Sequence, residues 1–386
     1  MLNTLNDVLN NVDNFIWGMP LIILILFTGI LLTVRLRGLQ IRHLGKALHY
    51  VFHNEDDGEG EVTSFGALCT ALSATIGTGN IVGCATAIVA GGPGALFWMW
   101  LAAFFGMATK YAEGMLAVKY RVIAEDGHAL GGPFYYIEKG MGKNFKWLAK
   151  LFCVFGTMVG LFGIGTFTQV NGITSAVNNF FDPSNVHTIS LFGMNYSISV
   201  VVAGIIVTIC AGLVIIGGIK RISKVSEVIV PFMAVTYIGV CLIIVFTHLP
   251  QVPAAFAEIV QSAFGLKAVA GGAIGAMTVA MQKGIARGIF SNEAGLGSAP
   301  IAAAAAQTNE PVRQGLVSMT GTFIDTIIVC TMTGLAIVMT GAWDMGLEGV
   351  AVTTKAFALG LPFPAKASAF VLMMCLVFFA FTTILG

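Results

Sequence analysis

Long apolar stretches recur along the whole chain, and they restrict the fold more than any other feature of the sequence. Nine of them are long enough for an α-helix to cross the roughly 30 Å hydrocarbon core of a membrane. These stretches are residues 15–34, 65–90, 95–118, 148–178, 197–218, 227–247, 259–286, 315–341 and 366–386. Only 10% of the 386 residues are charged, against about 25% in a typical soluble domain. The sequence therefore predicts an all-α polytopic membrane protein.

Lys and Arg are unevenly divided among the segments that join these stretches. Every second connection is basic, whereas 179–196 and 248–257 contain no Lys or Arg. Basic residues mark cytoplasmic loops, so we expect a multi-pass protein of the cell (inner) membrane with its N-terminus outside and its basic loops in the cytoplasm. The residues expected in those loops are Arg35, Arg37, Arg42, Lys46, Lys119, Arg121, Lys139, Lys143, Lys146, Lys220, Arg221, Lys224, Arg287 and Arg313.

The sequence gives no sign of an enzyme. It has no H-E-x-x-H metalloprotease motif, no G-x-x-x-x-G-K-[ST] phosphate loop, no G-x-S-x-G elbow and no CxxC pair. The seven cysteines are odd in number and all lie inside the apolar stretches, which argues against both disulfides and a zinc site. Without an ATP-binding motif, transport driven directly by ATP is not expected of this chain.

The second apolar stretch is interrupted by glycines in the sequence ATIGTGNIVG, residues 74–83. Gly77, Gly79 and Gly83 lower the cost of leaving helical geometry, and Thr78 and Asn80 add polar side chains at the same depth. A break in a membrane helix is tolerated only where it is buried in protein or lines a watery cavity. These residues therefore indicate a buried or water-lined binding site within the membrane.

A second interruption is expected in the stretch 259–286, which contains Gly271, Gly272 and Gly275 and, close by, Gln282. Two glycine-interrupted spans in corresponding positions point to a secondary transporter built from inverted repeats. At such breaks the freed N–H groups suit a carboxylate and the freed carbonyls suit a small cation. The alternative is that the glycines only let helices pack closely, as small-residue motifs do.

Three other polar positions lie deep in apolar stretches. Gln169 in GTFTQVNGI is expected to face the interior of the bundle, as a ligand contact or as an interhelical hydrogen bond. Thr382 and Thr383 place two adjacent hydroxyls in the last stretch. Hydroxyls suit an alkali cation, although threonines in helices often bond back to their own backbone.

Asp325 is the one acid well inside an apolar stretch and far from a basic loop. A charge at that depth costs at least about 2.5–3.5 kcal/mol, so the carboxyl is expected to be paired, protonated or functional. A structural pair, with Lys110 or with an Arg near the cytoplasmic face, is slightly favoured over a role in proton coupling.

Four stretches resemble the alanine/glycine:cation symporter family, also called sodium:alanine symporters: GTGNIVG, GGPGALFWMW, GGPFYYIEKGMG and RGIFSNEAGLGSAPIAAAAAQT. The resemblance covers essentially the whole chain and implies a LeuT-like inverted-repeat transporter in a single transmembrane domain. It implies an extra N-terminal helix at 15–34, a first five-helix repeat at 65–247 and an incomplete second repeat at 259–386. The family has two further helices, so the resemblance, like the apolar ending FFAFTTILG, leads us to expect a truncated C-terminal end.

The resemblance also implies individual site residues. Around the two broken helices, the substrate would be bound by Thr78, Gly79, Asn80, Phe167, Gln169, Met281 and Gln282. A sodium site between the first broken helix and the last stretch would use carbonyls near Ala74 and Gly77, the carbonyl of Phe379, and the hydroxyls of Thr382 and Thr383.

The implied function is sodium-coupled uptake of a small neutral amino acid, alanine or glycine, by alternating access at a site near the middle of the membrane. The coupling ion would be Na⁺, and lipid would be the surrounding partner. One alternative is proton coupling through Asp325. Others are a channel and an amino-acid sensor that does not transport, although no soluble signalling domain is attached.

Overall fold

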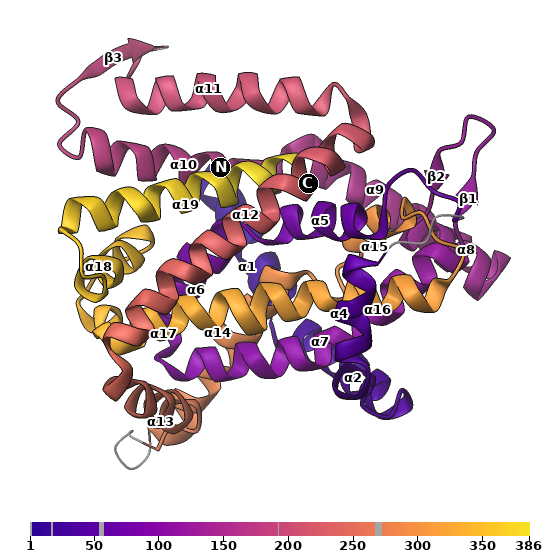
Figure 1. The fold of residues 1–386 in the computed structure, drawn as a ribbon, viewed down its shortest axis with the longest axis horizontal. Helices are drawn as coiled ribbons and strands as arrows, with labels where there is room; N and C mark the ends of the chain where they lie inside the picture. Colours follow the sequence, from indigo (N-terminus) through magenta and orange to yellow (C-terminus); the bar gives the residue numbers. More distant parts are fainter. Residues whose placement is uncertain (1, 17, 54–57, 192, 267–271) are drawn as a thin grey trace.

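The computed structural model describes residues 2–16, 18–53, 58–191, 193–266 and 272–386, and this part of the chain is helical apart from loops and two short hairpins (Figure 1). The predicted all-α class is therefore confirmed. The first third contains α1 (Leu2–Ile16), α2 (Met19–Arg35), α3 (Leu39–Arg42), α4 (Leu44–Phe52), α5 (Ser64–Thr75), η1 (Gly79–Gly83), α6 (Cys84–Gly91), α7 (Gly94–Lys119) and α8 (Pro133–Met141).

The middle and last parts continue the same pattern. After the short turn η2 (Lys143–Phe145), the helices are α9 (Lys146–Phe162), α10 (Ile164–Phe181), α11 (Ile198–Ile215), α12 (Gly218–Thr247), η3 (Leu249–Gln251) and α13 (Val252–Ala263). They are followed by α14 (Ala273–Asn292), α15 (Ala299–Ala304), α16 (Pro311–Thr322), η4 (Phe323–Cys330), α17 (Thr331–Thr340), η5 (Ala342–Asp344), α18 (Val350–Gly360) and α19 (Ala365–Leu385).

The two hairpins lie in connections between helices. Strands β1 (Val122–Ile123) and β2 (Ala129–Leu130) pair antiparallel between α7 and α8. Strands β3 (Thr188–Leu191) and β4 (Met194–Ser197) pair antiparallel between α10 and α11, with Thr188 opposite Ser197. The second hairpin occupies the connection 179–196, which contains no Lys or Arg.

Among the described residues, five helical segments are long and apolar enough to cross a membrane: 143–181, α11, α12, 311–340 and α19. The bent pair of α5 with 79–91 makes a sixth. The predicted spans 15–34 and 95–118 correspond to α2 and α7, which have 17 and 26 residues. Eight of the nine predicted spans thus coincide with helices, and the chain has the helices of a multi-pass membrane protein.

Small residues let α14 pack closely on α7. A Cβ added at Gly284 would collide with the carbonyl oxygen of Ala95, and one added at Gly288 would crowd Met99 and Ala102. In the absence of a strong hydrophobic drive between helices in lipid, such close backbone approach is a main source of helix association. For these two glycines the packing role is the observed one.

The largest buried cluster lies where α12, α18 and α19 meet α5 and η1. Its bulkiest members are Tyr237, Phe357 and Phe379, all fully buried. The hydroxyl of Tyr237 shares a 2.7 Å hydrogen bond with that of Thr333 on α17, so the one polar atom of this aromatic core is satisfied. The cluster holds α19 against the first broken helix.

A backbone latch joins the segment before α5 to the segment after α15. The N–H groups of Glu61 and Val62 donate to the carbonyl of Ala305, at 2.9 and 3.1 Å, and the N–H of Gln307 donates to the carbonyl of Val62 at 2.7 Å. The guanidinium of Arg121, at the end of α7, donates to four carbonyls on both sides of this latch. These carbonyls belong to Glu59, Ala304, Ala306 and Thr308.

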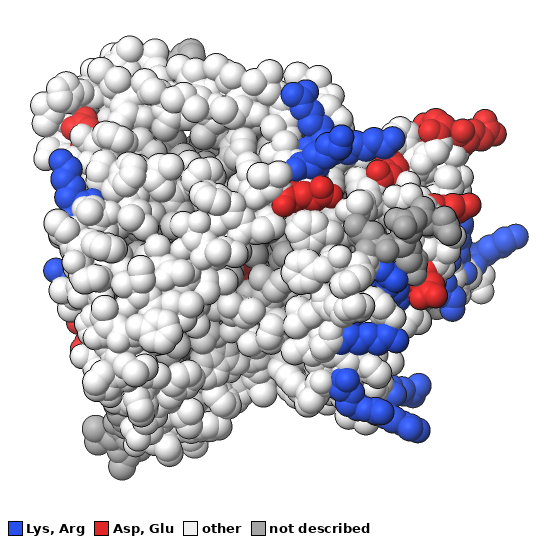
Figure 2. All heavy atoms as spheres, in the orientation of Figure 1, with Lys and Arg blue, Asp and Glu red and all other residues white. Residues whose placement is uncertain are grey.

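Most of the visible Lys and Arg side chains gather at the end of the molecule that carries β1, β2 and α8, and few lie at the opposite end (Figure 2). Several of the residues expected in the basic loops lie in helices. Lys220, Arg221 and Lys224 lie in the first turns of α12, and Arg287 lies inside α14. In both places the helix extends beyond the apolar stretch, because helix propensity does not require apolar residues.

Candidate functional site

The first predicted break is confirmed. Helix α5 ends at Thr75, and the chain resumes as the π-helical segment η1 and then α6 at an angle of 53°. At Ile76 the backbone turns to an extended conformation, with ψ at 92°. The residues that leave helical geometry are therefore Ile76 and Gly77, and Thr78 has already returned to it with φ of -56° and ψ of -24°.

Side chains satisfy the N–H groups that the break frees. The Oδ1 atom of Asn80 accepts a hydrogen bond from the N–H of Gly77 at 2.9 Å. The Oε1 atom of Gln169, on α10, accepts one from the N–H of Thr78 at 3.0 Å. Both amide side chains are buried, so each bond is made where an unsatisfied donor would be costly. The structure thus brings together four of the predicted substrate-binding residues at the break: Thr78, Gly79, Asn80 and Gln169.

Gly77 is required by its neighbours. A Cβ added at this position would collide with the Oγ1 atom of Thr383 and would lie 3.0 Å from Oε1 of Gln169. Helices α10 and α19 therefore approach the break from two sides, and only a glycine admits both.

Gly79 has the opposite surroundings. It is buried, yet a Cβ added there would find no atom within 4 Å beyond its two chain neighbours and its own helix backbone. A protein interior is normally close-packed, so the free space beside Gly79 is unusual. A small group fits there without displacing a side chain.

Asn80 also belongs to a buried polar cluster, which we call the Asp325 cluster and define as Asn80, Ser291, Asp325 and Thr326. The Nδ2 atom of Asn80 donates to Oδ1 of Asp325 at 2.7 Å. The hydroxyls of Ser291 and Thr326 donate to Oδ2 of Asp325, at 2.9 and 2.6 Å. The cluster joins η1, α14 and η4, and all four of its side chains are almost fully buried.

The expected pair of Asp325 with Lys110 or an arginine is wrong for the described part of the chain, where no cation lies within ion-pair distance of the carboxylate. Its partners are an amide and two hydroxyls. Asp325 lies in η4, where the helix widens to π-helical geometry over Phe323–Cys330. Such π-helical turns are frequent at functional sites, and this one turns the carboxylate toward the break.

Oxygens of the predicted cation site also meet at the break. The hydroxyl of Thr383 lies 3.3 Å from the carbonyl oxygen of Ile76 and 3.0 Å from that of Phe379. The hydroxyl of Thr382 lies 2.9 Å from the same Phe379 oxygen. These are neutral, hard oxygen atoms, which are the ligand type that alkali and alkaline-earth cations prefer. The donor set therefore fits Na⁺.

The other two carbonyls of the predicted cation site belong to Gly77 and Ala74. The carbonyl of Gly77 accepts the N–H of Asn80 at 3.2 Å, and Ala74 lies beside the end of α19, close to Gly386. The carbonyl that contacts Thr383 belongs to Ile76, which the sequence reasoning missed. The sequence could have pointed to Ile76, because it directly precedes Gly77, the first glycine of the break.

The second interruption differs from the prediction. Gly275 lies inside α14, which is a continuous helix from Ala273 to Asn292, and Gly272 precedes its first residue. Gly271 lies outside the described residues. The interruption that reaches the Asp325 cluster comes after α14, at 293–298, where Glu293, Gly295 and Gly297 have φ of 54°, 91° and 83°.

Ser291 and Asn292, the last residues of α14, were therefore missed as site residues. Asn292 donates to the hydroxyl of Thr326 at 3.0 Å, next to the bond from Ser291 to Asp325. The sequence SNEAGLGS, residues 291–298, could have pointed to them. It follows the expected span 259–286, and in it polar residues are followed by two glycines.

Three predicted site residues are not brought to the first break. Phe167 is 73% exposed, because residues two positions apart on a helix point about 200° apart and Gln169 faces inward. Met281 packs in a cluster with Ile22 of α2 and Ile285. Gln282 is half-buried, on the part of α14 that precedes Ser291 by more than two turns.

Two cavities flank the first break, one along each half of the broken helix. One, of about 240 Å³, is lined on α5 by Thr70, Ala71 and Ala74 and on its other sides by α12, α15 and the end of α19. The other, of about 400 Å³, is lined by Gly83, Thr86, Ala87 and Ala90 and by residues of α14. The break therefore lies between these two cavities along the broken helix.

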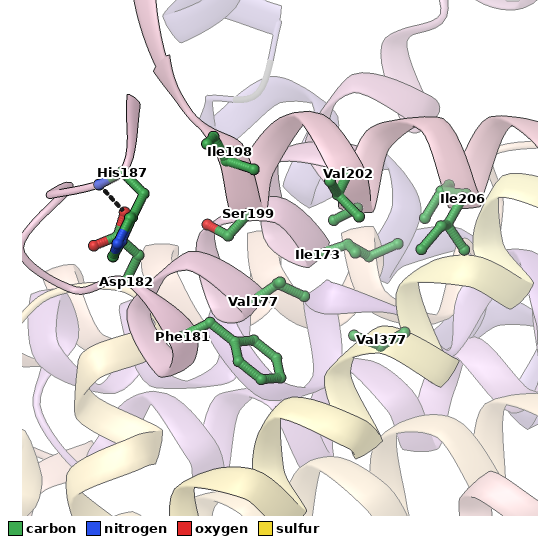
Figure 3. A pocket seen from close by; sticks show the side chains of 12 residues that line it. Ile173, Val177, Phe181, Asp182, His187, Ile198, Ser199, Val202, Ile206 and Val377 are labelled. Carbon is green, nitrogen blue, oxygen red and sulfur yellow. Dashed lines mark hydrogen bonds between the residues drawn. The ribbon is translucent and has the colours of Figure 1, made fainter. Parts of the chain in front are cut away.

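The largest of the described cavities, about 500 Å³, lies elsewhere, between α10, α11 and α19 (Figure 3). Ile173, Val177, Val202 and Ile206 point into it, and Asp182 and His187 lie at one end. Its aliphatic lining offers a zwitterionic ligand few polar partners, so we place the candidate site at the break.

Comparison with known proteins finds transporters that align along nearly the whole chain. A family model described as the sodium:alanine symporter family matches residues 2–386. A transporter of Haemophilus influenzae, described as uncharacterized, is 57% identical over 99% of this chain and 80% of its own length. The sodium/alanine symporter AgcS of Methanococcus maripaludis is 46% identical over 98% of this chain and 81% of its own length. The probable sodium/glutamine symporter GlnT of Bacillus subtilis is 38% identical, with 100% and 76% covered.

Proposed function

The chain belongs to the sodium:alanine symporter family, and we propose that it takes up small neutral amino acids, alanine or glycine, in symport with Na⁺. The observation that carries the proposal is the free space beside the buried Gly79, next to a break whose polar groups suit both a carboxylate and a cation. The space favours a small side chain by sterics. One added methylene changes binding by only about 1–3 kcal/mol, so strict specificity is not expected.

The substrate site is built from the first broken helix. Thr78, Gly79 and Asn80 lie at the start of a half-helix, where the helix dipole favours a carboxylate. Gln169 holds the N–H of Thr78 in place from α10. Ser291 and Asn292, at the end of α14, lie opposite the first broken helix. They take the role that the sequence reasoning gave to Met281 and Gln282. Phe167 would need to move to contact a substrate.

The cation site uses the oxygens of Phe379, Thr382 and Thr383, together with carbonyls of the segment Ala74–Gly77. The contact between Thr383 and Ile76 supports this placement. Na⁺ is the proposed driving ion, and a single charge that falls through 100 mV provides about 2.3 kcal/mol. Binding of the ion would tie α19 to the broken helix, and so couple occupancy of one site to the shape of the other.

Alternating access would move helices around this fixed site. The two cavities that flank the break support the idea, because each reaches one half of the broken helix. The architecture we propose is LeuT-like, with 15–34 as an extra helix and 65–247 and 259–386 as inverted repeats. Its second broken helix is then α14 with α15, interrupted at 293–298. We place the N-terminus outside the cell membrane and the basic end in the cytoplasm.

A second candidate for the coupling ion is the proton, and Asp325 favours it. The carboxyl is fully buried and has only neutral hydrogen-bond partners, so a change of its protonation would be felt directly at Asn80. Transport of the same amino acids would then follow the pH gradient instead of the sodium gradient.

The test is equilibrium binding of radiolabelled L-alanine to the purified chain in detergent, in sodium chloride and in choline chloride. Unlabelled glycine, leucine, glutamine and glutamate serve as competitors. We expect binding that requires sodium and that glycine displaces but glutamate does not. Binding of the same strength in choline chloride would contradict sodium coupling, and displacement by glutamine in preference to glycine would replace the proposed substrate.

A further inference from the structure

Arg287 occupies an unusual position in the middle of α14. Its guanidinium lies flat against Gly83, the last residue of η1, where an added Cβ would collide with its Nε, Cζ and Nη2 atoms. The ring of Phe290 lies 5.2 Å from the guanidinium carbon. Contacts with Gly83 and with the ring of Phe290 thus restrict the position of this side chain.

The charge of Arg287 is not neutralised by the described part of the chain. No carboxylate there lies within ion-pair distance of it. Its Nε atom is buried and has no hydrogen-bond partner there. A buried arginine donor without an acceptor is costly, and its fork of N–H groups matches a carboxylate.

A second cation lies beside the first. Lys283 is one turn earlier on α14, and residues four apart share a face of a helix. Both side chains line the cavity of about 400 Å³ that follows α6, together with the hydroxyl-bearing Thr86. The cavity is therefore open to a small anion, with a planar donor at one position and a mobile ammonium at the other.

This cavity ends at the broken helix. Gly83, against which the guanidinium lies, is three residues from Asn80 and belongs to the same π-helical segment. It lies on the α6 side of the break, whereas the cavity of about 240 Å³ lies on the α5 side. Arg287 therefore lies on the α6 side of the break, against the last residue of η1.

We propose that Arg287, assisted by Lys283, forms a carboxylate-binding site in the cavity between α6 and α14, at which an amino acid is held by its carboxylate apart from the site at the break. The identity of the ligand rests on the proposed function, whereas the carboxylate chemistry rests on the geometry alone. The site concentrates the substrate at the α6 side of the break, and it needs no cation for binding.

Modification of arginine by phenylglyoxal, followed by peptide mass spectrometry, tests the proposal at a single residue. The purified chain in detergent and choline chloride is treated with the reagent alone, with propionate, and with 2-aminopropanol, which has the amine but no carboxylate. We expect propionate to slow the adduct at Arg287, with the rate roughly halved when its concentration equals the dissociation constant. 2-Aminopropanol should give no protection, and Arg221, exposed on α12, reports the reactivity of a free arginine.

A matched pair of variants separates the site from general effects. Gly83→Ala places a methyl group where the guanidinium lies and should abolish protection by propionate. Gly275→Ala adds the same methyl to α14 where no other atom lies within 4 Å and should keep it. Protection that persists in Gly83→Ala would contradict the assignment.

Other results overturn the proposal or separate it from the proposed function. An unchanged adduct rate with propionate, while L-alanine still binds with sodium, overturns this inference and leaves the proposed function intact. Protection by phosphatidylglycerol added to the detergent micelles, but not by propionate, overturns it in favour of a lipid phosphate. Protection by propionate without any sodium-dependent alanine binding keeps the carboxylate site and contradicts the proposed function.

Discussion

The side-chain amide of Asn80 donates to the carboxylate of Asp325 across 2.7 Å, and this bond joins residues that are 245 positions apart in the sequence. Asn80 at the same time caps the N–H of Gly77 inside the break. One amide therefore fixes the shape of the break on one side and the carboxylate of η4 on the other. The state of Asp325 and the geometry of the proposed substrate site are connected through a single residue.

Asp325→Asn tests which ion is coupled. The substitution removes the charge but keeps the shape, and one of the three hydrogen bonds to the carboxylate must reorganise. Loss of one buried hydrogen bond costs about 1–3 kcal/mol, so we expect alanine binding to weaken by roughly tenfold and to keep its dependence on sodium at fixed pH. The measurement is alanine binding against sodium concentration at pH 7.

The matched control is Asp344→Asn, since Asp344 is exposed in η5. It should bind alanine as the unchanged chain does. If Asp325→Asn instead binds alanine independently of both pH and sodium, while the unchanged chain responds to pH, the coupling ion is the proton.

Gly77→Ala is expected to damage the proposed sodium site. The added methyl would collide with the hydroxyl of Thr383 and crowd Gln169, and overpacking typically costs about 1–3 kcal/mol. We expect the sodium concentration for half-maximal alanine binding to rise by roughly tenfold or more. Gly239→Ala on α12, where no other atom lies within 4 Å, should leave it unchanged. Equal effects of the two substitutions would show that an added methyl group at either position raises the sodium requirement, whether or not it lies at the proposed site.

Thr383→Val removes one proposed oxygen ligand at nearly constant volume. Because the hydroxyl of Thr383 contacts two carbonyl oxygens of the site, its loss should weaken the binding of sodium more than the binding of alanine. We expect a rise of roughly tenfold in the sodium requirement, equivalent to about 1.4 kcal/mol, and recovery in Thr383→Ser. Thr157→Val on α9, whose hydroxyl bonds only to its own helix, is the control. A sodium titration that does not shift in Thr383→Val would exclude this residue as a ligand.

Asp182 should make the hairpin between α10 and α11 sensitive to acid. The N–H of Val186 donates to its carboxylate at 2.9 Å, and the N–H of His187 and the hydroxyl of Ser197 donate at 3.1 Å. These bonds, chiefly the one from Val186, hold the pKa of Asp182 below its ordinary value. The folded state then binds fewer protons, so this contribution to stability is complete above the ordinary pKa of about 3.9 and is lost as the pH falls below it.

Thermal unfolding in detergent between pH 6 and pH 3 checks this prediction. The apparent Tm of the unchanged chain should fall more over that range than the apparent Tm of Asp182→Asn, which lacks the titrating group. Asp7→Asn, at an exposed position on α1, should fall as the unchanged chain does. Parallel curves for all three proteins would show that Asp182 does not contribute.

The sequence predicted the positions of most helices because lipid requires long apolar stretches, and it predicted the first break because glycines and polar residues coincide there. The same reasoning failed at the second break. Gly275 looked like an interruption, yet an isolated glycine in a helix is tolerated when tertiary contacts support the helix. The actual interruption at 293–298 contains Glu293 and Ser298, whose polarity resembled an ordinary loop.

Individual contacts were harder to predict than elements. The predicted inward orientation of Gln169 is confirmed, and the structure adds that its amide accepts a hydrogen bond from the N–H of Thr78. Phe167 was predicted as a site residue together with Gln169, although residues two positions apart on a helix point in nearly opposite directions. The partners of Asp325 come from three segments that no local pattern connects, so only the fold reveals that amide and hydroxyl groups replace the expected lysine.

Arg121→Lys should loosen the latch between the segment before α5 and the segment after α15. Lysine keeps the charge, but its single ammonium cannot reach the four carbonyls that the guanidinium holds. Loss of hydrogen bonds from a charged donor costs about 1.5–3 kcal/mol each, so we expect the apparent Tm in detergent to fall by a few degrees. Because the latch ties together the ends of both proposed broken helices, a cysteine placed at Ala74, beside the cavity on the α5 side, should also react faster with a water-soluble maleimide. Arg221→Lys on α12 should change neither quantity. A lower Tm with unchanged cysteine reactivity would make Arg121 a purely structural residue.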